Sequence, residues 1–150
     1  TTFLNRITHD VDLITAVRKL VEYHLHPAQF LSGKAKPSAY KRLALKLAPD
    51  VTIKMLAKLM TADRLGRNPE KGAPLTGPVA DVATFLRNAD KARVAEKVEA
   101  PILHGRDFMD VVQPGPEMGT FVKRAYQIQI MQGITDKEEL KRLVLRQMLK

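Results

Sequence analysis

The spacing of apolar residues is helical in every long segment of this chain, and this periodicity restricts the fold more than any other feature. Ile53, Leu56, Ala57 and Met60, for example, recur at intervals of three and four residues, which places them on one face of a helix. No segment alternates apolar and polar residues over the length of a strand. The sequence therefore predicts an all-α fold, a multi-helix bundle or solenoid-like array of about six to seven helices.

The same periodicity predicts which residues of the other helices face the core. These residues are Leu13, Val17, Leu20, Val21 and His24 in the first helix, Tyr40, Leu43, Ala44 and Leu47 in the second, Val82, Phe85, Leu86 and Ala89 in the fourth, Met118, Phe121, Val122, Ala125 and Ile128 in a later helix, and Leu140, Leu143 and Val144 in the last. A short helical turn over residues 106–111 is also predicted.

Capping residues and helix breakers predict where several helices begin and end. Ser38, Asp50 and Thr135 are typical N-cap residues, and Thr135 has a glutamate three residues later, which forms a capping box. The fourth helix is expected to run from about Pro78 to about residue 98. Gly133 is expected to end the later helix that carries Met118 to Ile128.

A predicted loop from residue 66 to residue 78 offers a boundary between two regions. It separates residues 1–75, the first helical region, from residues 76–150, the second. Alternatively, both halves share one solenoid-like core.

The chain is strongly basic, with 25 Lys and Arg against 16 Asp and Glu and a net charge of +9. Such a charge favours a polyanionic partner, nucleic acid first, although a solubilising surface charge is the alternative. Tryptophan is absent and aromatic residues make up only 5%, so we expect contacts to phosphates rather than base stacking. No apolar run is long enough to span a membrane, and the absence of cysteine excludes disulfides and thiolate metal sites. A cytoplasmic location is expected, and self-association into a homodimer stays open.

Residues that carry chemistry are sparse. His9 and Asp10 form a His-Asp pair, but they stand just before the first helix, where Asp10 is a good N-cap. His24 and His26 diverge on a helix and bind one metal ion only if Asp63 or another distant ligand joins them. We expect no catalytic residue and no metal site in this chain.

Two aspartates and one turn are candidate sites of phosphate chemistry. Asp107 and Asp110 lie three residues apart, but no glycine-rich phosphate loop accompanies them, so a capping or surface role is expected. Gly115, in a Pro-Gly-Pro turn, places free backbone N–H groups at a helix start, yet the neighbouring Glu117 opposes an anion there.

Lysine and arginine residues gather in several groups along the chain. One group, Lys34, Lys36, Lys41, Arg42 and Lys46, surrounds the start of the second helix. The residues predicted to contact RNA are Arg64, Arg67, Lys71, Arg106, Lys123 and Arg124.

Two stretches of sequence carry a resemblance to a known family. The first comprises His24-Leu25-His26-Pro27, Arg42-Leu43-Ala44 and Ala62-Asp63-Arg64-Leu65-Gly66-Arg67; the second comprises Pro101-Ile102-Leu103-His104-Gly105-Arg106-Asp107-Phe108-Met109, Pro114-Gly115-Pro116-Glu117-Met118-Gly119, Tyr126-Gln127-Ile128-Gln129 and Gly133-Ile134-Thr135. Together they resemble the C-terminal body and tail of HD-type bacterial tRNA nucleotidyltransferases and poly(A) polymerases. The resemblance spans nearly all of the chain.

The resemblance implies a role for this region and a place for the chemistry. In that family the helical body and tail hold the acceptor and TΨC arms of tRNA, while a catalytic head with Mg²⁺ adds nucleotides to the 3′ end. The glycine-rich strand-turn and paired aspartates of that head are not found in this sequence, and the HD signature is expected before Thr1. The resemblance therefore implies a tRNA-binding fragment that is inactive alone. The alternatives are an HD-type metal-dependent phosphohydrolase piece using His24, His26 and Asp63, and a helical protein-interaction module.

Overall fold

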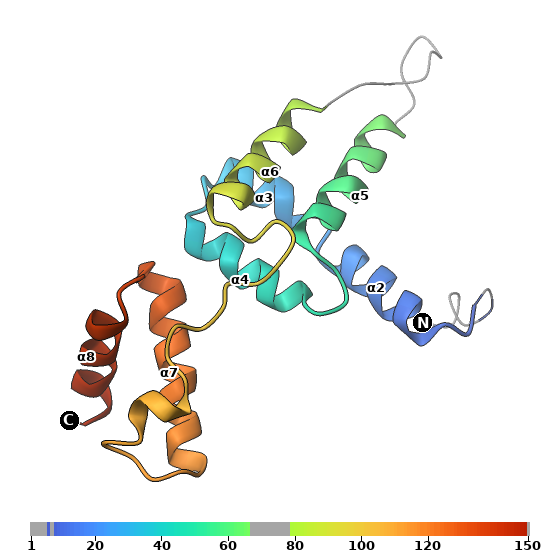
Figure 1. Ribbon diagram of the computed structural model, residues 1–150. Coiled ribbons are helices and arrows are strands. Elements are labelled where there is room, and N and C mark those ends of the chain that lie inside the picture. The colour runs from blue at the N-terminus through green and yellow to red at the C-terminus, as the bar shows by residue number, and fades with distance from the viewer. Residues whose placement is uncertain (1–5, 7, 67–78, 150) are drawn as a thin grey trace. The chain divides into compact units, whose positions relative to one another are not determined.

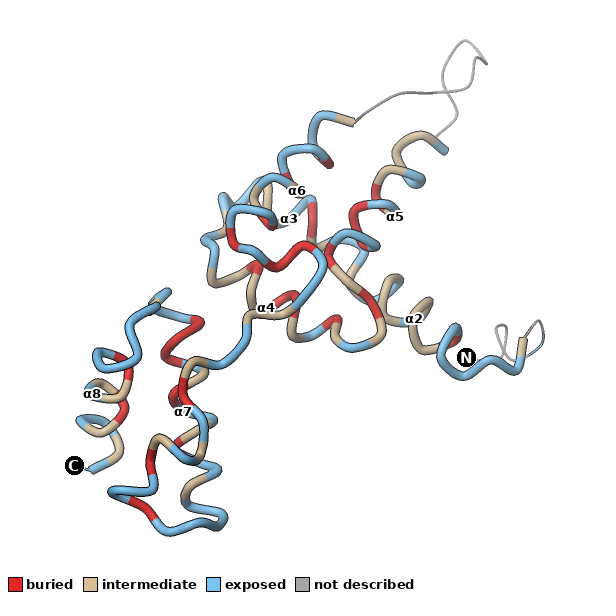
Figure 2. The backbone as a smooth tube through the Cα atoms, in the orientation of Figure 1, coloured by how far each residue is buried: buried red, intermediate tan, exposed pale blue. Residues whose placement is uncertain are grey.

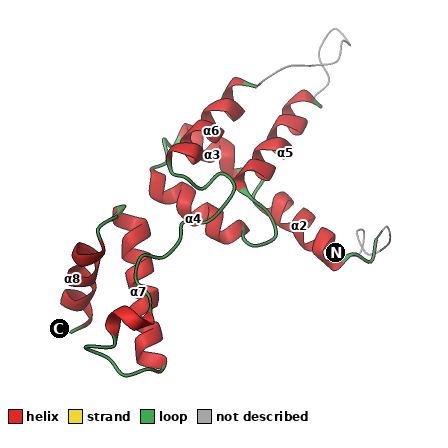
Figure 3. Cartoon of the chain, in the orientation of Figure 1, coloured by secondary structure: helices red, strands yellow, loops and turns green. Residues whose placement is uncertain are grey.

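The structure is a computed structural model that describes Arg6, residues 8–66 and residues 79–149. These residues form seven α-helices and one 3-10 helix, and no strand occurs among them (Figures 1 and 3). The helices are α2 (Val11–Glu22), α3 (His26–Ser32), α4 (Pro37–Leu47), α5 (Ile53–Leu65), α6 (Ala80–Lys91), η1 (Gly105–Phe108), α7 (Pro116–Gln132) and α8 (Lys137–Met148). The all-α prediction and the predicted number of helices are confirmed.

The chain divides into two compact units, each with its own core. Unit 1 covers Thr1–Val98 and contains α2 to α6, and unit 2 covers Glu99–Lys150 and contains η1, α7 and α8. The division lies 23 residues after the expected boundary at residue 75, because α6 packs against α3, α4 and α5 and so belongs to the first unit. The two cores are separate clusters rather than one solenoid-like core.

The core of unit 1 forms where the apolar faces of α4, α5 and α6 meet. Leu47, Ile53, Leu56 and Phe85 have no exposed surface, and the apolar part of Tyr40 is buried with them. Burial of a leucine, isoleucine or phenylalanine side chain contributes about 1.5–3 kcal/mol, so these positions dominate the stability of the unit. Figure 2 marks such buried positions in red along each helix.

The core of unit 2 is smaller and forms between η1, α7 and α8. Phe108 packs edge to face on Phe121, with their ring centres 5.6 Å apart, and Leu140 and Val144 of α8 close the cluster. Gly133 ends α7 in the left-handed conformation, with φ 65°, as its position in the sequence predicts.

The predicted face of the first helix is partly wrong. Leu13 and Val21 are 50% and 59% exposed, whereas Ile14 is the buried residue of α2. Leu20 lies partly buried against the core of unit 1. Apolar residues occur around much of this helix, so contact with α5 selects the buried face, which is rotated from the predicted one.

Three predicted caps are displaced by one or two residues. Pro37 begins α4 ahead of Ser38, Thr52 rather than Asp50 caps α5, and Asp136 rather than Thr135 caps α8. In α8, the Asp136 carboxylate accepts a hydrogen bond from the Glu139 N–H at 3.2 Å. Several adjacent residues can cap a helix, and the backbone geometry at each turn selects one of them.

The helix predicted to reach residue 98 ends at Lys91. Arg93 takes a positive φ of 61°, and the Val94 N–H donates a hydrogen bond to the Ala89 carbonyl oxygen at 3.0 Å. The following segment is buried at Val94 and Ala95, and the Ala95 carbonyl accepts a hydrogen bond from the Lys54 N–H. Burial of this segment against the start of α5 therefore replaces the last predicted helical turns.

Candidate nucleic-acid interface

The positive charge of the chain is concentrated in unit 1. This unit has 17 Lys and Arg against 9 Asp and Glu, a net charge of +8, whereas unit 2 has 8 against 7, a net charge of +1. Unit 1 therefore generates nearly all of the positive potential that would attract a polyanion. A separate charge count for the two halves of the sequence would have indicated this asymmetry.

Arg64, a predicted RNA contact, lies in the last turn of α5 and bonds within the protein. Its Nη1 donates to Oδ2 of Asp81 on α6 at 3.0 Å, and its side chain is 30% exposed. This ion pair joins the two helices and partly neutralises the guanidinium. Arg67 and Lys71, predicted as its neighbours in an RNA contact, lie outside the described residues.

The predicted contacts in unit 2 have different surroundings. Arg106, in η1, and Lys123, on α7, are exposed. Arg124 instead joins α7 to α8, because its Nε and Nη2 donate to Oε1 of Gln147 at 3.1 and 2.8 Å. Arg106 and Lys123 are thus the better placed of the three for contact with an anion.

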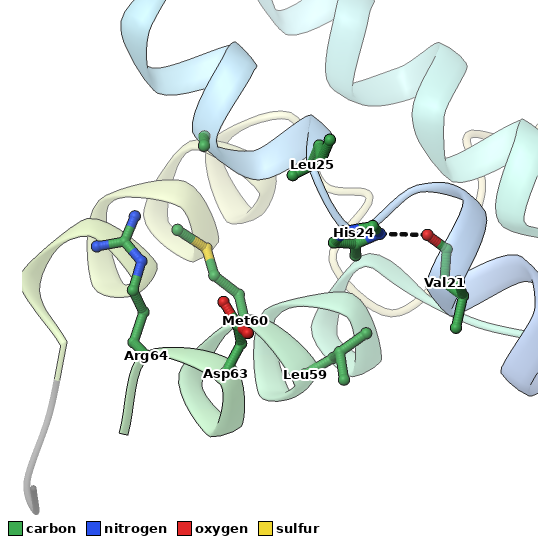
Figure 4. A pocket seen from close by; sticks show the side chains of 8 residues that line it. Val21, His24, Leu25, Leu59, Met60, Asp63 and Arg64 are labelled. Atoms are coloured by element: carbon green, nitrogen blue, oxygen red, sulfur yellow. Dashed lines mark hydrogen bonds between the residues drawn. The ribbon is translucent and has the colours of Figure 1, made fainter. Parts of the chain in front are cut away.

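A hollow of about 280 Å³ in unit 1 brings together three residues that the sequence singled out (Figure 4). His24, Asp63 and Arg64 line it together with apolar side chains, among them Val21 and Leu25, which are 59% and 58% exposed. The Nδ1 atom of His24 hydrogen-bonds to the Val21 carbonyl oxygen, as the dashed line in Figure 4 shows. The hollow therefore combines an imidazole, a carboxylate and a guanidinium with apolar walls.

The structure separates the three ligands of the alternative metal site. His24 and Asp63 share this hollow, but His26 begins α3 and packs edge to face on Tyr23, with ring centres 4.9 Å apart. Pro27 lies in the first turn of α3, so His26 belongs to a different helix from the one that His24 follows. Within residues 8–66 and 79–149, no group of three or more His, Cys, Asp or Glu side chains is arranged to hold a metal ion.

Asp107 and Asp110 have the structural roles expected from the sequence. The Asp107 carboxylate accepts the His104 N–H at 2.8 Å and pairs with Lys137 of α8, also at 2.8 Å. Asp110 pairs with Lys141 at 3.0 Å. The hydrogen bond from Lys137, followed by the one from the His104 backbone, lowers the pKa of Asp107. The hydrogen bond from Lys141 lowers the pKa of Asp110. Both carboxylates therefore serve to attach lysines of α8 to the segment around η1.

Comparison with known proteins gives no relative from which a function can be transferred. No protein-family model, curated protein or solved structure matches the chain. Among the described helices, none has the combined length and hydrophobicity needed to cross a lipid bilayer.

Proposed function

We propose that this chain is an RNA-binding helical region of a tRNA nucleotidyltransferase or poly(A) polymerase, and that it holds the acceptor and TΨC arms of tRNA. The catalytic head and its Mg²⁺ lie outside this chain, and the complete enzyme works in the cytoplasm. The observation that carries the proposal is the concentration of charge: unit 1, an all-helical body, has a net charge of +8. The motif resemblance in both units supports the choice of tRNA as the polyanion.

The physical basis of binding is electrostatic. A protein that neutralises phosphates releases the cations condensed on the RNA, so its affinity falls as the salt concentration rises. Helical surfaces meet an RNA duplex mainly at phosphates and 2′-hydroxyls, so the protein reads the shape of the arm rather than its base sequence.

The salt dependence of tRNA binding tests this proposal. With about three to five phosphate contacts, the logarithm of the binding constant should fall with the logarithm of the salt concentration with a slope of roughly −2 to −4. Different tRNAs should bind with similar affinity, because their duplex arms share one backbone geometry. Absence of binding, or binding that does not change with salt, would contradict the proposal, and the second result would favour a protein-interaction module.

A paired substitution tests the exposed candidates of unit 2. Arg106→Ala with Lys123→Ala removes two predicted contacts, and Arg142→Ala with Arg146→Ala removes the same charge from exposed positions on α8. We expect the first pair to flatten the salt slope by about one, a minor part of the total, and the second pair to have little effect. Equal effects of both pairs would show that these two predicted contacts are not specific ones.

An activity assay tests the assignment of the chemistry to another region. Incubated with tRNA, CTP, ATP and Mg²⁺, this chain alone should leave the 3′ end unchanged, because a nucleotidyl transfer site requires carboxylates that hold Mg²⁺ near the phosphates. Robust incorporation of nucleotides would overturn that assignment.

A further inference from the structure

Two adjoining hollows on unit 1 share Phe30 and are bordered by cations. The first, of about 310 Å³, is lined by residues of α3, α4, α6 and the segment before α4, and it includes Lys34 and Lys91. The second, of about 160 Å³, lies along α4 and includes Arg42 and Lys46. Figure 1 shows α3, α4 and α6 close together in unit 1. We call the four cations Lys34, Arg42, Lys46 and Lys91 the α4 face.

The wall between the hollows is held by aromatic packing. Phe30 lies edge to face on Tyr40, with ring centres 5.1 Å apart, and its ring centre is 6.2 Å from that of Phe85. Tyr40 and Phe85 are 1% and 0% exposed, and the Tyr40 hydroxyl accepts a hydrogen bond from Asn88 Nδ2 at 3.1 Å. Because these side chains are fixed by their contacts, the hollows are formed before any ligand binds, which lowers the entropy cost of binding.

The charged side chains that line these hollows are all positive. Neither lining contains an Asp or Glu, and residues 33–49 contain five Lys and Arg and no acidic residue. Lys19 and Lys54 of the same unit, by contrast, are bound to Asp50 and Glu96. Within the part of the chain that the structure describes, no ion pair involves any cation of the α4 face.

The position of each cation allows all four to act on one extended anion. Arg42 and Lys46 are one turn apart on α4, about 6 Å along the helix axis. Lys34 takes a left-handed conformation, φ 50°, in the turn that joins α3 to α4. Lys91 is the last residue of α6, and both lysines line the first hollow. Long side chains at these positions keep their charged ends in water, where they can meet phosphates.

We propose that the α4 face contacts the phosphate backbone of the bound RNA and is the main electrostatic contact of this chain. The inference rests on the proposed function and differs from the predicted contacts, since it places the principal contact on unit 1 at residues not among the six candidates. The cations meet phosphates, and Asn88 and Thr84 in the first hollow supply uncharged polar groups beside them. The ring of Phe30 is occupied by its neighbours and is only partly exposed, so contact with the backbone is favoured over base stacking.

The test compares two variants of the 150-residue chain that carry the same net charge. The α4-face variant combines Lys34→Gln, Arg42→Gln, Lys46→Gln and Lys91→Gln. The control variant combines Arg18→Gln, Lys54→Gln, Lys58→Gln and Lys97→Gln, which are exposed residues of the same unit outside both hollows. Glutamine keeps most of the side-chain length and a good helix propensity, and circular dichroism with thermal unfolding verifies that both variants fold.

Binding of fluorescently labelled tRNA is measured by anisotropy from about 50 to about 200 mM KCl, the range in which multi-contact complexes lose affinity steeply. We expect the α4-face variant to remove most of the salt slope of the chain, flattening it by about two to three, since each lost phosphate contact removes about 0.7–0.9. The control variant should keep a slope within about one of the unmodified chain. Polyglutamate, an acidic polypeptide without phosphates, serves as a second ligand and should bind at least ten times more weakly than tRNA.

The outcomes separate this inference from the proposed function. If the unmodified chain binds tRNA with a steep slope and the two variants weaken it equally, the α4 face is not the contact although the chain still binds RNA. Unchanged binding by the α4-face variant overturns the inference in the same way. If polyglutamate binds as tightly as tRNA and is lost with the α4-face variant, the partner is an acidic protein and the RNA contact is overturned. Failure of the unmodified chain to bind tRNA removes the proposed function itself.

Discussion

Gln129 is the one buried polar side chain of the described core, and replacing it tests how unit 2 holds its first segment. It is 1% exposed on α7, and its side-chain hydrogen bonds reach residues 99–102. Its Oε1 accepts the Ile102 N–H at 2.9 Å, and its Nε2 donates to Oε2 of Glu99 at 3.0 Å and to the Ala100 carbonyl oxygen at 2.9 Å. One side chain thus fixes the path by which the chain enters unit 2.

The magnitude follows from these three bonds. Two of them join uncharged groups and contribute about 0.5–1.5 kcal/mol each, and a bond to a carboxylate contributes about 1.5–3 kcal/mol. Glu99 and Ile102 are partly exposed and regain some hydrogen bonding to water when Gln129 is lost, which lowers the sum. Gln129→Met keeps the length of the side chain and removes all three bonds, so we expect it to destabilise unit 2 by about 2–4 kcal/mol.

Native-state hydrogen exchange is the suitable assay, because it reports on each unit separately in a chain with two cores. A loss of about 2–4 kcal/mol lowers the protection of the most stable amides of α7 by about 30-fold to 1000-fold. The Ile102 amide should lose protection most directly, since its acceptor is removed. Gln132→Met, at an exposed position on the same helix, is the control and should change little. A loss below about 0.5 kcal/mol with Ile102 still protected would refute the reasoning.

Three further predictions concern stability. Leu56→Ala, at a fully buried position of unit 1, should destabilise that unit by about 2–5 kcal/mol in urea unfolding. Gly133→Ala should cost about 1–2 kcal/mol, because φ is 65° there and nothing lies within 4 Å of an added Cβ, so the cost is in the backbone alone. The lowered pKa of Asp107 means that its stabilisation of unit 2 is present above the ordinary value of 3.8 and is lost as the pH falls through the folded-state pKa. Lys137→Gln should therefore reduce the loss of stability in acid, measured by hydrogen exchange across that pH range.

Each of these has a matched comparison. Met55→Ala, at a position 47% exposed next to Leu56, should cost under about 0.5 kcal/mol. Gly119→Ala lies inside α7 with open space around an added Cβ and should stabilise by about 0.5–1 kcal/mol, the opposite sign to Gly133→Ala. An acid profile unchanged by Lys137→Gln would show that this lysine is not the main cause of the lowered Asp107 pKa.

The local features of the fold could be read from the sequence. Ile53, Leu56, Ala57 and Met60 repeat at helical spacing and are all buried, and Gly133 ends α7 in a left-handed conformation. Such features depend on residues within one or two turns of each other, and the periodicity and the conformational preferences of glycine act over that range. The net charge of +9 and its excess in the first half are likewise properties of the sequence alone.

Only the tertiary structure decided which surfaces are available and where the units divide. Arg64 and Arg124 looked equivalent to Arg106 in the sequence, but their partners Asp81 and Gln147 come from helices that only folding brings near. The burial of Val94 and Ala95, which ends α6 early, likewise depends on α5, about 40 residues earlier in the chain. The sequence lists the charged and apolar groups, whereas long-range packing decides which charges bind each other and which remain on the surface for a ligand.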